Sequence, residues 1–214
     1  MKEVKKFIKS IYDNIFNDFV KNFKKELSEC DSILDLGCGP NSPVQFCDAS
    51  LKVGVELFEP YLKETKKKKI HNEYIREDIL KVDFKPKSFD AVIMIDVLEH
   101  LTKEDGYKLI KKMENWSKKK IVIFTPNGFI ENEPERDGNI FQEHKSGWEA
   151  KDLRKIGFKV YGSDGWKKLR GKNAVIKYKP HKLFVLISDI TQKISYDYPE
   201  TAFHLFAVKE TGNN

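Results

Sequence analysis

The chain has 214 residues, of which 40% are hydrophobic and 34% are charged. Its length fits one large domain, and its 15 Phe, 8 Tyr and 3 Trp exclude a low-complexity disordered chain. No run of about 18 apolar residues occurs, so we expect no membrane span, and the charged N-terminal segment predicts no secretory signal. The net charge is +6, and the three cysteines form no CxxC pair. We therefore expect a cytoplasmic protein without disulfides or a bound metal.

The first predicted element is a helix that spans most of residues 1–28. Between residues 4 and 27, apolar side chains recur at steps of three and four, which places them on one face of a helix. We interpret this face as docked on the rest of the domain. A helix lying on a membrane surface is the alternative, and four acidic residues in the segment weaken it: Glu3, Asp13, Asp18 and Glu26.

The next hundred residues alternate between short apolar runs and helical stretches. Runs that are apolar almost throughout are typical of parallel strands covered by helices on both faces. The pattern predicts an α/β fold with a doubly wound, mostly parallel sheet. The predicted strands are 32–36, 52–56, 73–76, 89–96 and 120–124, and the predicted helices are about 42–49, 60–69 and 103–116.

The last third of the chain contains two segments that we expect to cover a substrate pocket. The first is the long connection 125–147, since loops of this length in compact domains are usually functional or disordered. The second is an insertion, 163–200, with a helix over 181–194. Aromatic residues in and beside these segments would line the pocket, namely Phe129, Phe141, Trp148, Trp166, Tyr196 and Tyr198. A helix over about 148–156 and strands over 158–161 and 202–208 complete the prediction.

A glycine turn follows the first strand, in the sequence Ile33-Leu34-Asp35-Leu36-Gly37-Cys38-Gly39-Pro40. The two glycines let a ligand approach the backbone, and Ser42 with Pro43 can start a short helix. A dinucleotide-binding loop would need a third glycine at position 42, and Pro40 removes a backbone N–H that a pyrophosphate would use. An ordinary tight turn is the alternative reading of the glycines.

Acidic residues stand at the ends of the second and third strands. Glu56 can accept both hydroxyls of a ribose. Asp78 can accept from the amine of an adenine, beside the backbone N–H of Ile79. Either carboxylate alone is more often merely exposed to solvent. The glycine turn, Glu56 and Asp78 follow three successive strands, however, and together they predict a nucleoside-binding site.

Together with Ser88-Phe89-Asp90-Ala91-Val92 and Asp96-Val97-Leu98-Glu99-His100-Leu101, these motifs give the chain a resemblance to the class I S-adenosylmethionine-dependent methyltransferases. The resemblance covers roughly residues 30–160. It implies a single methyltransferase domain over 1–214, a seven-stranded sheet whose last strand is antiparallel, and S-adenosylmethionine as cofactor. The implied cofactor-binding residues are Asp35, Gly37, Cys38, Gly39, Glu56, Leu57, Asp78, Ile79, Asp96 and Val97. The chain departs from the family at Asn41, where many members have glycine, and in its short first helix.

Methyl transfer to a hydroxyl is helped by a base that removes the proton. The candidate catalytic residues are His100, after the fourth strand, and His144, at the end of the connection 125–147. Each could instead be structural, as we expect of His71, His181 and His204.

The leading hypothesis is a methyltransferase that transfers the methyl group to an oxygen atom of a small-molecule acceptor and acts as a monomer or homodimer. One alternative is an RNA or protein methyltransferase, which the net charge and the basic segment 166–172 favour. Two observations argue against it. The fourth strand ends in Asp96-Val97-Leu98-Glu99 and not in the Asn/Asp-Pro-Pro-aromatic motif of enzymes that methylate amino groups of nucleic acids, and no separate RNA-binding module is visible. A non-catalytic domain that binds the cofactor is the third reading.

Overall fold

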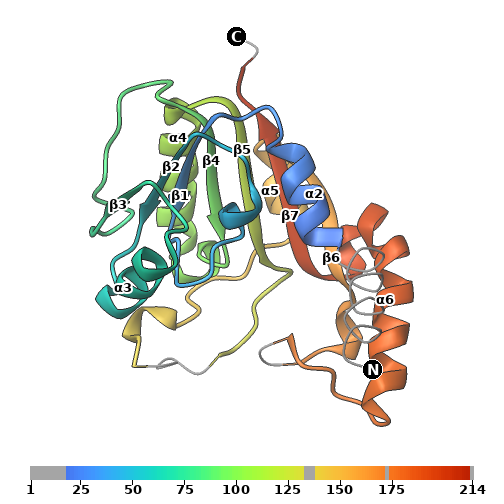
Figure 1. Cartoon of the computed structure of the whole chain (residues 1–214). Helices are drawn as coiled ribbons and strands as arrows, with labels where there is room; N and C mark the ends of the chain where they lie inside the picture. Colours follow the sequence, from blue (N-terminus) through green and yellow to red (C-terminus); the bar gives the residue numbers. More distant parts are fainter. Residues whose placement is uncertain (1–17, 133–137, 172–173, 213–214) are drawn as a thin grey trace.

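The computed structural model describes residues 18–132, 138–171 and 174–212, and a seven-stranded sheet forms its centre (Figure 1). The strand order is β3-β2-β1-β4-β5-β7-β6. Neighbouring strands from β3 to β5 pair in parallel, whereas β7 is antiparallel to both β5 and β6. This confirms the predicted fold class. The strands are β1 Ser32–Leu36, β2 Leu51–Val55, β3 Glu73–Ile75, β4 Phe89–Ile95, β5 Ser117–Pro126, β6 Lys159–Trp166 and β7 Ala202–Glu210.

Helices and single helical turns connect these strands. The helices are α2 Asp18–Glu26, α3 Glu59–Lys68, α4 Lys103–Trp116, α5 Ala150–Lys155 and α6 His181–Asp197. The 3-10 turns are η1 Pro43–Phe46, η2 Leu98–His100, η3 Ile140–Gln142, η4 Lys167–Leu169 and η6 Pro199–Thr201.

The helix predicted over 42–49 was wrong, because only the single turn η1 forms there. Its start is as predicted: Ser42 caps the turn by accepting from the backbone N–H of Val44, and Pro43 follows. The backbone N–H and the hydroxyl of Ser50, however, both donate to the Asp31 carboxylate just before β1. These bonds hold the chain beside β1, so that it enters β2 directly.

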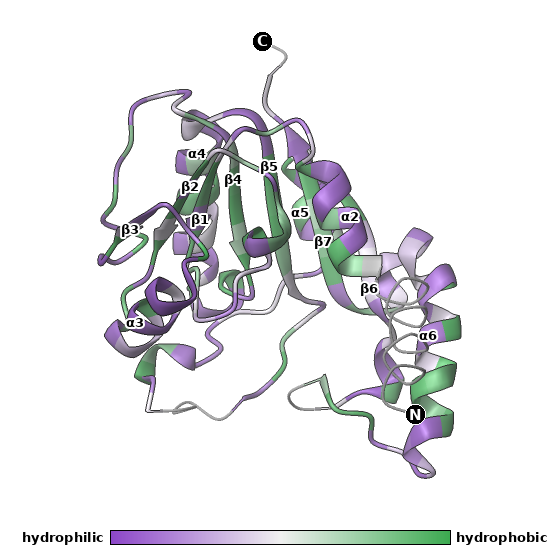
Figure 2. Ribbon diagram, viewed as in Figure 1, coloured by the Kyte–Doolittle hydropathy of each residue, from purple (hydrophilic) through white to green (hydrophobic). Residues whose placement is uncertain are grey.

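Two apolar layers hold the sheet between helices. On one face, Leu109, Met113 and Trp116 of α4 and Leu153 of α5 are fully buried against the strands. On the other face, Phe23 of α2 is fully buried, and the ring of Phe19 contacts those of Phe124 in β5 and Phe206 in β7. Figure 2 shows the strands as the most continuous apolar part of the chain. The predicted docking of the N-terminal helix is therefore confirmed for Asp18–Glu26, and its part before residue 18 lies outside the described residues.

The residues of helix α6 that are buried against β6 are polar, namely Ser188, Gln192 and Ser195. The Gln192 side chain accepts from the backbone N–H of Gly165 and donates to the carbonyl of Gly162. A Cβ at Gly162 would lie 2.0 Å from the Ser195 carbonyl oxygen, and one at Gly165 would lie 2.2 Å from that of Ser188. Only glycine permits this approach of helix and strand. The apolar residues on the other side of α6 are exposed: Leu183, Leu186, Ile190 and Ile194.

Within the part of the chain that the structure describes, no helix is both long enough and apolar enough to cross a bilayer.

We expect Gly162→Ala to destabilise the fold, since the new Cβ would collide with backbone that cannot rotate away. Overpacking of this kind costs about 1–3 kcal/mol, and thermal or denaturant unfolding measures it. Gly171→Ala in the same region is the matched control, because its Cβ would meet only the flexible Lys177 side chain and the distant Val175 carbonyl. Equal stability of the two variants would contradict the packing described for α6.

Candidate functional site

A cavity of about 670 Å³ opens at the carboxyl ends of β1, β2 and β4. This size suits a nucleoside-sized ligand. All ten residues predicted to bind the cofactor line it: Asp35, Gly37, Cys38, Gly39, Glu56, Leu57, Asp78, Ile79, Asp96 and Val97. The parallel register explains the gathering, because it brings the ends of neighbouring strands to one edge.

The two glycines of the turn after β1 have different roles. Both have positive φ, +69° at Gly37 and +53° at Gly39. A Cβ at Gly37 would lie 2.5 Å from a methyl group of Val97, so this glycine permits close packing of the turn on the segment after β4. A Cβ at Gly39 would meet no atom within 4 Å. Gly39 therefore presents bare backbone to the cavity.

Contacts from outside the turn hold it in place. The backbone N–H groups of Gly37 and Cys38 both donate to the Val55 carbonyl at the end of β2. The Lys68 ammonium at the end of α3 donates to the Pro40 carbonyl (3.1 Å) and to the Asn41 side chain (2.5 Å). One lysine of the run 66–69 thus ties α3 to the turn.

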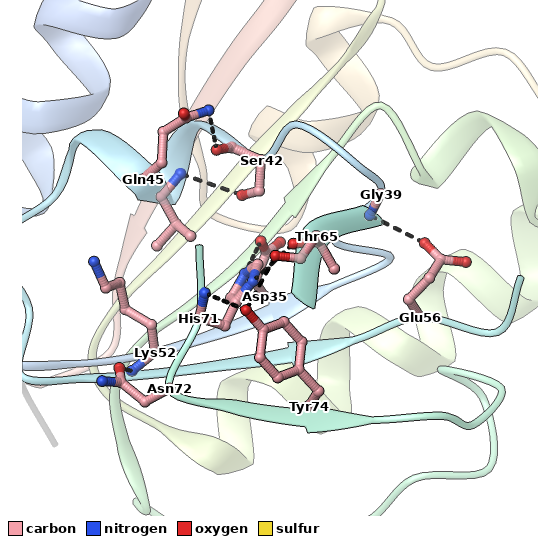
Figure 3. Close-up of polar contacts among 11 residues, drawn as sticks. Asp35, Gly39, Ser42, Gln45, Lys52, Glu56, Thr65, His71, Asn72 and Tyr74 are labelled. Atoms are coloured by element: carbon pink, nitrogen blue, oxygen red, sulfur yellow. Dashed lines mark hydrogen bonds and ion pairs between the residues drawn. The ribbon is translucent and has the colours of Figure 1, made fainter. Parts of the chain in front are cut away.

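Glu56 faces the turn across the cavity (Figure 3). One of its carboxylate oxygens accepts from the Gly39 N–H at 3.0 Å, and the other accepts from the Phe58 N–H at 2.7 Å. Burial raises the pKa of Glu56, and these two bonds oppose the shift. A carboxylate has about four lone-pair sites, so the two oxygens retain capacity for a further donor.

Asp35 is held by a buried histidine that the sequence analysis interpreted as structural. The Asp35 carboxylate lies 2.9 Å from Nε2 of His71, and the other ring nitrogen lies 3.4 Å from the Thr65 hydroxyl (Figure 3). Gly54 makes room for this ring, since a Cβ there would lie 3.0 Å from it. His71 therefore orients a residue that lines the cavity.

Asp78 lies in the turn that follows β3 and lines the first cavity. Its Oδ1 accepts from the backbone N–H of Leu80 at 2.9 Å, which fixes the side chain. Apolar side chains also line this cavity, namely Leu57, Ile79, Leu80, Val97 and Leu101. A partly buried carboxylate between apolar walls suits a flat base that carries an amine.

A second cavity, of about 380 Å³, adjoins the first. Asp96, His100 and Gln142 line both cavities. The second cavity also contains side chains far apart in sequence, including Glu99, Asn132, His144 and His204. Two cavities that meet at shared polar residues can hold two reactants in contact.

Asp96 stands where the two cavities meet. It adopts φ +52°, a left-handed conformation that costs energy for a residue other than glycine, and its N–H donates to the Phe124 carbonyl. Solvent reaches its side chain through the cavity, yet surrounding protein desolvates it, which raises its pKa. Strained backbone held in this way is typical of functional sites.

Glu99 of η2 forms hydrogen bonds that hold the connection 125–147 beside η2. Its backbone carbonyl accepts from the N–H groups of Lys145 (2.8 Å) and Ser146 (3.1 Å), while its side chain accepts from the Thr125 hydroxyl (3.0 Å). Its side chain is only 3% exposed. Burial, followed by the charge of Asp96, raises the pKa of Glu99 to about 8.

The two predicted catalytic histidines lie together, with ring centroids 4.9 Å apart. Nδ1 of His100 lies 3.1 Å from the Glu143 carbonyl, and Nδ1 of His144 lies 2.6 Å from the Ile130 carbonyl. Burial lowers the pKa of His100 to about 4 and also lowers the pKa of His144. Both imidazoles are therefore neutral near pH 7, with Nδ1–H donating and Nε2 carrying the free lone pair.

The predicted aromatic pocket is largely wrong. Phe141 lines the first cavity, but Trp148 is fully buried in the core, where its N–H donates to the Ser146 hydroxyl. Tyr196 stacks on Tyr161 of β6. An alternating or periodic pattern cannot distinguish an aromatic residue that fixes a loop to the core from one that lines a cavity.

His204, which the sequence analysis interpreted as structural, lines the second cavity from β7. Its Nδ1 lies 2.6 Å from the Asp164 carboxylate of β6, and its ring stacks on Phe124 of β5. No local motif marks it, because its partners belong to strands whose pairing only the fold defines.

Known proteins share both the sequence of this site and its fold. The methyltransferase-domain family model matches residues 34–124, which include the end of β1, all of β2, β3 and β4, and most of the residues that line the first cavity. An uncharacterized protein of Methanocaldococcus jannaschii is 29% identical over 187 residues, which are 77% of this chain and 78% of that protein.

Two solved structures share the fold over almost the whole chain. A SAM-dependent methyltransferase from Archaeoglobus fulgidus has a TM-score of 0.55 at 18% identity, covering 94% of this chain and 98% of its own. The plantazolicin methyltransferase BpumL, in complex with SAH, has a TM-score of 0.57 at 18% identity, covering 98% and 90%. The matched methyltransferase domain, the sheet order and the ten motif residues around one cavity agree with the resemblance of the chain to the class I S-adenosylmethionine-dependent methyltransferases.

Proposed function

We propose that this S-adenosylmethionine-dependent methyltransferase methylates a hydroxyl oxygen of a small molecule that binds in the second cavity. When bound, the cofactor supplies an electrophilic methyl group on a positively charged sulfur. The observation that carries the proposal is the contact between the two cavities at Asp96 and His100, because methyl transfer requires the two reactants to meet in line.

The first cavity fits the cofactor on two features of its own residues. Gly39 offers open backbone where a Cβ would project into the ligand space, and Glu56 keeps acceptor capacity beyond its bonds to Gly39 and Phe58. We propose that Glu56 accepts from the ribose hydroxyls and that Asp78 accepts from the adenine amine. Asp35, held by His71, and the turn at Gly37 would then position the methionine end.

The second cavity favours an acceptor that reacts through oxygen. Its volume of about 380 Å³ is at the lower end of the range for small-molecule sites. His100 and His144 project neutral imidazoles toward it, and Asn132 and Gln142 add amide groups. We propose that His100 and His144 activate the acceptor hydroxyl.

The basic segment 166–172 gives less support to an RNA or protein acceptor than its composition indicates. The Arg170 guanidinium donates to the carbonyls of Asp164 and Ala174 and to the Ser188 hydroxyl, so it holds α6 and β6 together. Lys168 lies over the ring of Trp166. These contacts give Arg170 and Lys168 structural roles.

We expect Glu56→Ala to weaken S-adenosylhomocysteine binding by about 1.5–3 kcal/mol, or roughly 10- to 100-fold, because hydrogen bonds to a charged group contribute on this scale. Isothermal titration calorimetry measures the affinity. Glu104→Ala is the control, because this exposed residue of α4 pairs with Lys108 and lines neither cavity, so the variant should bind as the unmodified protein does. If both variants bind equally well, the ribose is held elsewhere.

Gly39→Val should abolish cofactor binding, because the valine side chain would fill the space in front of the turn. Gly157→Val is the control for the strain of a positive φ. Gly157 has φ +90°, and a Cβ there would meet only the Lys209 side chain. We expect both variants to lose stability in thermal unfolding, but only the change at Gly39 should remove binding. Retained affinity in Gly39→Val refutes the placement of the ligand.

Screening fractionated extracts for release of S-adenosylhomocysteine tests the acceptor class. We expect small-molecule fractions to support release and purified RNA or protein fractions not to. With an active fraction, His144→Ala should slow turnover at least about 100-fold, the lower range for an activating side chain, while cofactor affinity stays within about twofold. Release that depends on RNA or protein, or a parallel loss of turnover and cofactor affinity, contradicts the proposal.

A further inference from the structure

We propose that Glu99, His100 and His144 bind a divalent transition-metal ion at the boundary of the two cavities. The sequence analysis expected no metal, because it considered the cysteines and found no zinc motif. The three proposed ligands lie on two separate segments, η2 and the connection after β5, that the fold brings together.

The distances allow one ion to contact all three side chains. A carboxylate oxygen of Glu99 and one ring nitrogen from each histidine lie within 4.8 Å of one another. Ligands at about 2.1 Å from one ion are themselves about 3.0–3.4 Å apart. Closing the difference takes small side-chain movements, and both histidines border an open cavity that permits them.

Both histidines are oriented as metal ligands usually are. Carbonyl oxygens can only accept, so the contacts to Glu143 and Ile130 require that Nδ1 carry the proton in each ring. The Nε2 lone pairs are then available to an ion. A ligating histidine typically donates its other N–H to a backbone carbonyl, and this arrangement is present twice.

The surrounding hydrogen bonds hold the three ligands before any ion binds. The Thr125 hydroxyl donates to the Glu99 carboxylate and fixes its rotation. The carbonyl of Glu99 accepts from Lys145 and Ser146, which places His144 directly over η2. The backbone N–H of His144 also donates to the side-chain oxygen of Asn132 at 2.9 Å. Support of this kind is what tunes metal affinity beyond the ligands themselves.

The donor set indicates the class of ion. Two imidazole nitrogens and one carboxylate oxygen suit first-row divalent transition metals better than Mg²⁺ or Ca²⁺, which prefer oxygen alone. Asp96 adds a second carboxylate on the same cavity wall. A cation here would offset the repulsion between two carboxylates in a desolvated site.

The role of the ion rests on the proposed function. An acceptor hydroxyl bound to the ion would lose its proton more readily, and that proton would pass to water in the cavity. The oxygen would then form its bond to the methyl carbon, while the bond between this carbon and sulfur breaks and sulfur keeps the electron pair. His100 and His144 would thus activate the acceptor by holding the ion rather than by accepting a proton themselves.

Titration of the untagged, metal-stripped chain with Co²⁺ and with Mn²⁺ tests the site without an acceptor. We expect one equivalent to bind, with Co²⁺ giving visible absorption bands typical of mixed nitrogen and oxygen ligands. His144→Ala and Glu99→Gln should each lower the affinity at least about 10-fold. His181→Ala is the control, since this exposed histidine at the start of α6 lies far from the cluster in the sequence and outside both cavities.

Several results would overturn the metal site. These are no stoichiometric binding, unchanged affinity in both ligand variants, or an equal loss in His181→Ala. Circular dichroism verifies that each variant is folded, and the conservative Glu99→Gln change serves if His144→Ala does not fold. A protein that binds no metal yet still methylates a small molecule refutes this inference alone. Specific metal binding without small-molecule turnover supports the site and refutes the proposed function instead.

Discussion

The site depends on the parallel pairing of β1 with β2 and of β1 with β4. Parallel strands end at the same edge, so each of these strands delivers its following residues to one place. The turn after β1, Glu56 after β2 and Asp96 after β4 meet there although up to about sixty residues separate them in the chain. The buried apolar layers on both faces fix the strands, and with them the spacing of these polar groups.

Hydrogen bonds from polar side chains refine this arrangement. Glu56 both lines the cavity and binds the Gly39 N–H, so one carboxylate shapes the turn that it faces. His71 does the same for Asp35 from a buried position, and Lys68 holds the turn from α3. Because such groups are costly to bury without partners, their pairing keeps the site in one conformation before any ligand enters.

The second cavity depends on a different constraint. The connection after β5 returns to the sheet edge because the backbone of Glu99 binds Lys145 and Ser146, and because Trp148 is buried beside α4. Asn127 adds bonds from the start of the connection to the carbonyls of Pro199 and Ala202. These contacts place His144 against His100 and define which polar groups surround an acceptor.

The amino-acid sequence was enough to predict the sheet and most of its strands, because apolar runs are a local pattern. It also predicted ten of the residues that line the first cavity, some from the glycine turn and the acids at strand ends and the others from the family resemblance. Helix α4 was also predicted with its bounds, Lys103–Trp116, since its apolar spacing is continuous. The folded structure was needed to show that residues 47–50 are not helical, that Trp148 belongs to the core, and that His204 and Glu99 line a cavity. Those outcomes depend on contacts between segments distant in the chain. A local pattern does not predict them, because it does not indicate which partner a side chain will contact.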